Sequence, residues 1–226
     1  MWPVADMWRR WTTPPRGPYS APEPLKVKPA LEPAQIDVRP VTMPEPIPTS
    51  LMMDSLQIAR GQVGVREVPP DSNRGPDVER YLASVGRGPG DSWCAAFCYW
   101  CILQAWRNRH EGWTPEEGSP PAPFPRTAWT HEVLLWGSGV PGRLITPTEI
   151  AEGKTLPAGA AFLMWGSVNW GTGQGVRHIG FVDNYDALSQ EVHSIEGNTN
   201  TAGSREGGGV YRLTRPLESV YRFVAY

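Results

Sequence analysis

The sequence is poor in cysteine, and its few thiols lie close together. Only three cysteines occur among 226 residues, and all of them fall between positions 94 and 101. Such close spacing, about two helical turns, cannot join distant parts of the chain, so a disulfide framework is excluded. We therefore expect reduced thiols.

Long apolar runs and clusters of one charge are also missing. No apolar run approaches the ~20 residues that span a bilayer, which excludes a membrane-spanning helix. The N-terminus has no apolar stretch after its first charges, so we expect no secretory signal peptide and synthesis in the cytoplasm. The formal net charge is −2 and the charges are spread out, which argues against nucleic-acid and membrane partners. We expect a monomer.

Proline is abundant in only one part of the chain. Residues 1–50 contain twelve of the 25 prolines and no sustained apolar period, which predicts an extended or disordered segment. This segment is either a plain spacer or a docking segment for a partner. The second interpretation stays open because exposed indoles, here Trp2, Trp8 and Trp11, are unusual in a pure linker. We expect the folded domain to comprise residues 51–226.

Helical patterns come first in that domain and strand patterns last. Short helices are expected at 53–64, 77–85 and 95–106, the last of them with Asp91 or Ser92 as its N-cap. Residues 107–156 resemble an insertion with one short helix at 129–136. Strands separated by Gly- and Asn-rich turns are expected at 160–165, 178–185, 191–196, 209–213 and 220–225.

This order of elements predicts the fold class. Without crossover helices between them, consecutive strands form an antiparallel sheet. We therefore expect an α+β fold in which N-terminal helices pack on a C-terminal antiparallel sheet of about five strands.

Cys94 is the candidate nucleophile. It stands in the first turn of its expected helix, where unpaired N–H groups and the helix dipole favour the thiolate. Cys98 and Cys101 lie deeper among apolar neighbours and are expected to be small buried residues. The spacing of the three also resembles the iron–sulfur signature of radical S-adenosylmethionine enzymes, which would require the segment to be a loop. We expect no metal and no cofactor.

His178, Glu196 and Asn198 are the candidate partners of Cys94. His178 opens an expected strand, next to Gly180, whose small size would leave room for a substrate. Glu196 and Asn198 are two positions apart on the next strand, so both can reach one site, whereas His193 points to the opposite face. A carboxylate or carboxamide there would orient the imidazole and stabilise its charged form.

Together these motifs resemble one known family. Trp93-Cys-Ala-Ala-Phe97, Gly159-Ala-Ala-Phe-Leu163, Arg177-His-Ile-Gly-Phe-Val182 and Glu196-Gly-Asn198 are similar to the cysteine, histidine-dependent amidohydrolase/peptidase (CHAP) family. This papain-like group occurs in phage endolysins and bacterial cell-wall hydrolases. The similarity extends over about residues 56–226, with Ala160 replacing an acidic residue common in the family.

The resemblance implies a papain-like fold and a peptidoglycan hydrolase. Its activity would be that of an N-acetylmuramoyl-L-alanine amidase or a peptide endopeptidase, acting through a cysteine thioester. Cys94 would be the nucleophile, His178 the general base and acid, Glu196 the residue that orients His178, and Asn198 a second polar partner. Trp93 and Trp165 are expected to line the substrate cleft.

Two further expectations concern delivery and the opposing class of function. Without an export signal, the enzyme would reach the wall after holin release, in a virion or by injection. Residues 1–50 could then bind a phage virion or a secretion apparatus. The alternative function is a catalytically silent wall-binding or structural module of a phage tail or secretion apparatus.

Overall fold

Five α-helices lie in the part of the chain that the structure describes. The structure is a computed structural model, and it describes residues 49–110, 122–167, 173–203 and 207–226. The predicted properties of residues 1–48 therefore lie outside the described residues. The helices are α1 (Thr49–Gly61), α2 (Pro76–Ser84), α3 (Cys94–Arg109), α4 (Thr130–Ser138) and α5 (Pro147–Ala151).

Local sequence explains how several of these helices begin. In α2, Pro76 occupies the first turn, where its missing N–H costs no hydrogen bond, and Asp77 and Glu79 complement the helix dipole. In α5, Thr146 and Glu149 form a reciprocal capping box. By contrast, α3 is held by burial, because ten of its sixteen residues are buried.

The strands of the described chain form one antiparallel sheet of six. They are β1 (Leu144–Ile145), β2 (Ala161–Ser167), β3 (Gln174–Asp186), β4 (Glu191–Thr199), β5 (Gly209–Pro216) and β6 (Arg222–Val224). Their order across the sheet is β1-β6-β2-β3-β4-β5, and a 3-10 turn, η2 (Leu217–Ser219), joins β5 to β6. Because helices precede the sheet, the predicted α+β class is confirmed.

The differences from the sequence prediction are local. Two short elements were missed: β1, which pairs with β6 at the edge of the sheet, and α5. Both fall within residues 107–156, which therefore contribute to the sheet as well as to the surface. The predicted N-cap of α3 is wrong, because the helix begins at Cys94 and its N-cap is Trp93, without a side-chain capping bond.

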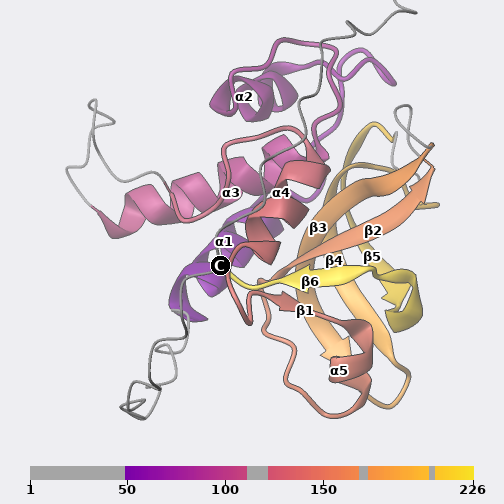
Figure 1. Cartoon of the computed structure of the whole chain (residues 1–226). Helices are drawn as coiled ribbons and strands as arrows, with labels where there is room; N and C mark the ends of the chain where they lie inside the picture. The colour runs from indigo at the N-terminus through magenta and orange to yellow at the C-terminus, as the bar shows by residue number, and fades with distance from the viewer. Residues whose placement is uncertain (1–48, 111–121, 168–172, 204–206) are drawn as a thin grey trace, which may run out of the picture. The chain divides into compact units, whose positions relative to one another are not determined.

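Helices α1 to α4 lie to one side of the sheet in Figure 1, and α5 lies near the end of the sheet. The contact between α3 and the sheet is aromatic: the Phe97 and Phe181 rings meet edge to face at 6.1 Å. Gly197 on β4 permits this close approach, since a Cβ there would stand 2.7 Å from both Phe97 and Trp93. The first turns of α3 are therefore fixed directly over β3 and β4.

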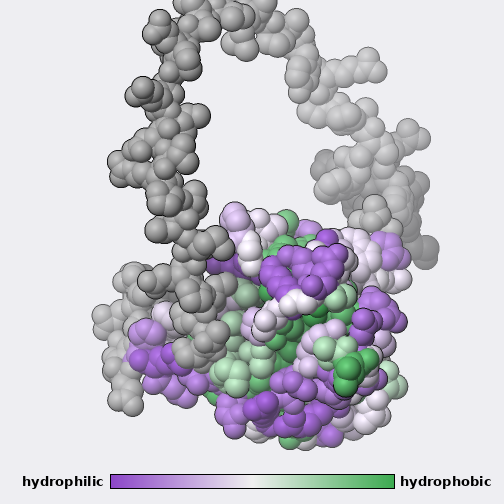
Figure 2. All heavy atoms as spheres, turned by 90° about the horizontal axis from the view of Figure 1, so that it is seen from below, coloured by the Kyte–Doolittle hydropathy of each residue, from purple (hydrophilic) through white to green (hydrophobic). Residues whose placement is uncertain are grey.

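On the face seen in Figure 2, hydrophobic residues form a central patch bordered by hydrophilic ones. Apolar atoms contribute more than half of the surface of ordinary folded proteins, so this exposure is unexceptional. None of the helices in the described part of the chain combines the length and apolar composition that crossing a membrane requires.

Candidate functional site

Cys94 is the first residue of α3. Phe97 donates its backbone N–H to the Trp93 carbonyl, so the helix is hydrogen-bonded from its first turn. The N–H groups before Phe97 have no partner within the helix and point toward its N-terminus, where Cys94 lies. All three cysteines are buried, but the Cys94 residue retains 5 % exposure, whereas Cys98 and Cys101 have none. Of the three cysteines, Cys94 therefore lies nearest to the solvent.

Trp93 belongs to the core, so its predicted place in a substrate cleft is wrong. It is fully buried, packed against Tyr81 and Phe97, and its Nε1 donates to Glu67 Oε1 over 2.8 Å. Glu67 Oε2 accepts from the backbone of Ser72 and Asn73. Glu67 thus ties the loop before α2 to the residue before Cys94. The sequence carried no signal for this contact, because it joins residues 26 positions apart.

His178 lies on β3, opposite Met164 of β2, and points to Glu196 of β4. The distance between His178 Nε2 and Glu196 Oε2 is 2.8 Å, and both side chains are buried. Gly180 makes room for this contact, but not for a substrate as the sequence suggested. A Cβ at position 180 would stand 2.7 Å from Glu196 Cγ and 2.8 Å from the Phe162 ring.

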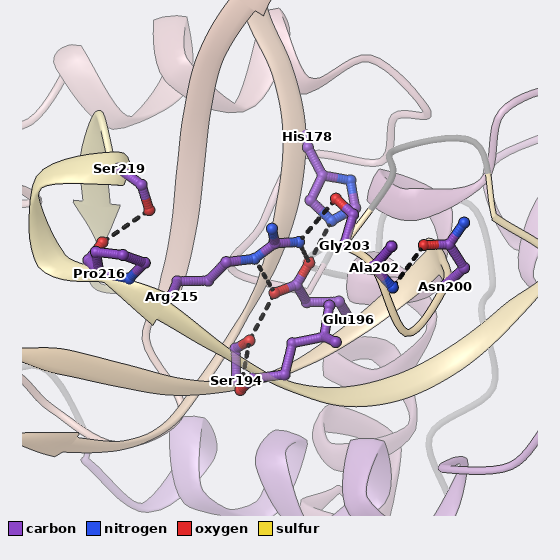
Figure 3. A network of polar contacts seen from close by, with 10 residues as sticks. His178, Ser194, Glu196, Asn200, Ala202, Gly203, Arg215, Pro216 and Ser219 are labelled. Carbon is purple, nitrogen blue, oxygen red and sulfur yellow. Dashed lines mark hydrogen bonds and ion pairs between the residues drawn. The ribbon is translucent and has the colours of Figure 1, made fainter.

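Glu196 accepts hydrogen bonds from two further side chains, as Figure 3 shows. Arg215 on β5 donates from Nε to Oε1 over 2.9 Å and from Nη2 to Oε2 over 2.6 Å. Ser194 Oγ donates to Oε1 over 2.6 Å. Both carboxylate oxygens therefore accept two hydrogen bonds each. The sequence analysis missed Arg215, which lies beyond the strand predicted at 209–213.

The charges of this network stabilise one another. Burial lowers the pKa of His178, but contacts with Cys94 and Glu196 outweigh burial and raise it to about 9. Burial likewise raises the pKa of Glu196, but His178 and Arg215 outweigh it and bring the value to about 2. A protonated imidazole beside an ionised carboxylate is the favoured state near neutral pH. The Cys94 thiol is one of the groups beside this ring.

The second ring nitrogen of His178 is unoccupied. Its Nδ1 is buried and makes no hydrogen bond of ordinary geometry to any described residue. The opposite nitrogen is held by Glu196, so Nδ1 is the one left to exchange a proton with Cys94 or with a bound molecule. This arrangement of thiol, imidazole and carboxylate can support nucleophilic catalysis.

Asn198 does not join this network as predicted. Its carboxamide is buried, and neither its oxygen nor its nitrogen has a hydrogen-bond partner among the described residues. The reason lies in the backbone. The register of β4 against β5 shifts between Glu196 and Thr199, and Asn198 has a φ of 57°. This irregularity breaks the strand alternation on which the prediction relied.

The remaining predicted positions lie apart from this contact. Trp165 is 46 % exposed and its ring lies 4.9 Å from that of Tyr221. Its predicted role in substrate binding stays a prediction. His193 is hydrogen-bonded to Thr214 on the neighbouring strand and has no contact with Glu196, as alternation indicated.

The iron–sulfur interpretation does not fit the geometry. Cys94, Cys98 and Cys101 stand on a regular helix, and the last two point into the core. A cluster would need all three sulfurs to converge from a loop. Within the described ranges, no three acidic, histidine or cysteine side chains are grouped as a metal site.

The chain was compared with protein-family models, with curated proteins and with solved structures, and none of these comparisons found a match. The site is therefore defined by its own geometry. It consists of a cysteine at a helix N-terminus next to a buried histidine that is bound to an arginine-paired glutamate.

Proposed function

We propose that this chain is a cysteine amidohydrolase or peptidase that cleaves an amide bond of peptidoglycan. The single observation that carries the proposal is the buried His178–Glu196 contact of 2.8 Å, with Cys94 beside the same ring. The resemblance of the surrounding motifs to the CHAP family supplies the substrate class. The α+β fold, with Cys94 at the start of α3, is consistent with that resemblance.

The proposed reaction has two halves. The Cys94 thiolate attacks the carbonyl carbon of the amide, and the negative oxygen that forms is stabilised by N–H groups at the start of α3. The imidazolium of His178 then gives its proton to the departing amine, which leaves a thioester on Cys94. In the second half, neutral His178 takes a proton from water, and the resulting hydroxide hydrolyses the thioester. Glu196 keeps the ring oriented throughout.

One exposed side chain would serve substrate binding, whereas Asn198 would stay inside the site as a second polar group, because its carboxamide is buried. Trp165 offers an exposed ring on which a sugar or an apolar peptide group could pack. Delivery to the wall through holin release, a virion or injection, with residues 1–50 contacting the apparatus, remains part of the proposal.

The test is lysis of purified sacculi by the full chain, followed as loss of turbidity. Cys94→Ala should abolish lysis because the nucleophile is lost. Cys98→Ala is the matched control, since it removes a buried thiol of the same helix and should retain activity in the fraction that folds. Circular dichroism should show that both variants are folded. Retained lysis by Cys94→Ala would refute the proposed nucleophile.

The same assay separates an enzyme from a catalytically silent module. Iodoacetamide should modify Cys94 and stop lysis by an enzyme, whereas a wall-binding module would sediment with sacculi and release nothing with or without the reagent. Mass spectrometry of the released fragments would then identify the bond. A new L-alanine amino terminus indicates an amidase, and a cut within the stem peptide indicates an endopeptidase.

A further inference from the structure

Arg215 is the group that fixes the carboxylate behind the candidate site. Its guanidinium contacts Glu196 through two parallel hydrogen bonds of 2.9 and 2.6 Å, the fork geometry that only arginine can make. The same Nη2 also donates to the Gly203 carbonyl over 3.2 Å. Three contacts to two separate parts of the chain leave the guanidinium little freedom to turn (Figure 3).

This fork determines how the carboxylate meets the imidazole. Oε2 is shared between Arg215 Nη2 and His178 Nε2, so the plane that satisfies the guanidinium also sets the direction of the bond to the ring. Ser194 holds the other oxygen. The side chain of Glu196 is thus fixed by β5 and by its own strand before His178 makes its contact.

The contact with Arg215 also keeps the Glu196 carboxylate ionised. Glu196 is completely buried, and a lone carboxylate in that position would either take up a proton or hold the proton of His178 tightly. With Arg215 present, the carboxylate stays compensated when the imidazolium gives up its proton. Such a proton must leave and return in any reaction that uses His178 as both acid and base.

We propose that Arg215 is a positioning residue for the Cys94–His178 pair, acting through Glu196. The inference deepens the proposed function and rests on it for its catalytic meaning. Two effects of Arg215 can be measured in the protein without substrate. The guanidinium fork orients the imidazole, and the positive charge of Arg215 eases release of the proton from His178.

The charged and titratable groups around His178 come from three elements. They are Cys94 on α3, Glu196 on β4 and, behind Glu196, Arg215 on β5. The residue opposite His178 on β2 is Met164, which carries no charge. Cys98, one turn deeper in α3, stays a neutral thiol because burial raises its pKa. Arg215 is therefore the one cation that contacts Glu196 besides the imidazolium itself, among the described residues.

The experiment compares Arg215→Gln, Arg215→Lys and Arg212→Gln in the full chain by NMR titration of the His178 ring protons. Loss of a nearby cation should raise the His178 midpoint by about one pH unit in Arg215→Gln. Arg215→Lys keeps the charge, so its midpoint should stay near that of the wild type. Arg212 lies on the same strand but pairs with Asp183, so Arg212→Gln should change nothing.

A second measurement tests the orienting role. The rate of Cys94 alkylation by iodoacetamide at pH 7, read by intact mass, should fall in both Arg215 variants, because neither retains the fork. Arg212→Gln should react at the wild-type rate. A purely structural Arg215 would lower the melting temperature without moving the titration midpoint of the folded protein.

The outcomes separate this inference from the proposed function. An unchanged or lowered midpoint in Arg215→Gln, or wild-type alkylation in both Arg215 variants, would overturn the role of Arg215. Should Arg215→Gln fail to fold, Arg215→Lys still decides the orienting role through its alkylation rate. A wild-type chain that titrates and alkylates as expected but never cleaves sacculi would instead overturn the hydrolase proposal.

Discussion

At the scale of single residues, Glu196 is the centre of the site. It is completely buried, yet it accepts four hydrogen bonds from His178, Arg215 and Ser194. A buried carboxylate is tolerable only when it is compensated in this way. The chemistry that the thiol and imidazole can perform therefore depends on a residue that never meets the solvent.

Glu196→Gln should lower the pKa of His178 from about 9, because burial, which favours the neutral ring, would no longer be opposed by a carboxylate. NMR titration of the ring protons measures this directly. Glu191→Gln is the control, since Glu191 begins the same strand and its carboxylate accepts a hydrogen bond from Ser189, away from His178. An unshifted midpoint in Glu196→Gln would show that another group sets the charge of His178.

The same substitution has a consequence for stability with a definite sign. The pKa of Glu196 is about 2 against an ordinary 4.5. The ionised carboxylate therefore makes its full contribution to the free energy of unfolding above about pH 4.5, and this contribution is lost as the pH falls through 2. At pH 7 the variant leaves Arg215 without its anion, which should cost about 3 kcal/mol in the free energy of unfolding. Urea unfolding at pH 7 and pH 3 should show that the difference in free energy of unfolding between the wild type and Glu196→Gln is smaller at pH 3.

At the scale of elements, the site depends on how closely β3, β4 and α3 approach one another. Two glycines make the approach possible: Gly180 faces the Glu196 side chain and Gly197 faces the Phe97 and Trp93 rings. Neither position has room for a side chain. The backbone spacing of the strands thus sets the 2.8 Å contact between His178 and Glu196.

Gly180→Ala should therefore impair both stability and the site. The new Cβ must displace Glu196 Cγ and the Phe162 ring, and such overpacking costs about 1–3 kcal/mol. Lytic activity and Cys94 alkylation should both fall. Gly61→Ala at the end of α1 is the matched control, because a Cβ there meets nothing within 4 Å. A Gly180→Ala protein with unchanged unfolding and alkylation would contradict the close packing described here.

At this scale, the sequence predicted those elements that depend on short-range residue patterns. The helix that carries Cys94 in its first turn, the strands of His178 and Glu196 and the outward turn of His193 follow from spacing over a few residues, although the N-cap of that helix did not. Arg215 was missed because its contact depends on the register of a third strand. Trp93 and Asn198 were misjudged because burial against distant Glu67 and an irregular backbone after Glu196 are properties of the assembled fold.

At the scale of the whole molecule, residues from Pro44 to the C-terminus form one unit by their contacts. Helix α1 belongs to its core, since Leu51 and Met52 near the start of the helix are buried. The backbone of Met52 lies so close to Gly159 that a Cβ on residue 159 would stand 2.2 Å from the carbonyl oxygen of Met52. The first turns of α1 are thus packed against the segment that leads into β2.

Shortening the chain from its N-terminus should reveal this boundary. A protein that begins at Pro44 should melt at the same temperature as the full chain and keep its lytic activity. A protein that begins at Ser55 loses two buried apolar side chains, at about 2–5 kcal/mol each for residues of this kind, and should melt far lower. Equal melting of the two shortened proteins would show that α1 adds nothing to the core.

Because Cys98 and Cys101 are buried, thiol labelling can report whether the chain is folded. Burial raises the pKa of both thiols, so they stay protonated and shielded, while Cys94 is the one cysteine of the three with residual exposure. An electrophilic fluorophore should consequently attach once per native molecule, and more than once only after unfolding. The ratio of dye to polypeptide would then report the fraction of native molecules in any preparation, without any assay of activity.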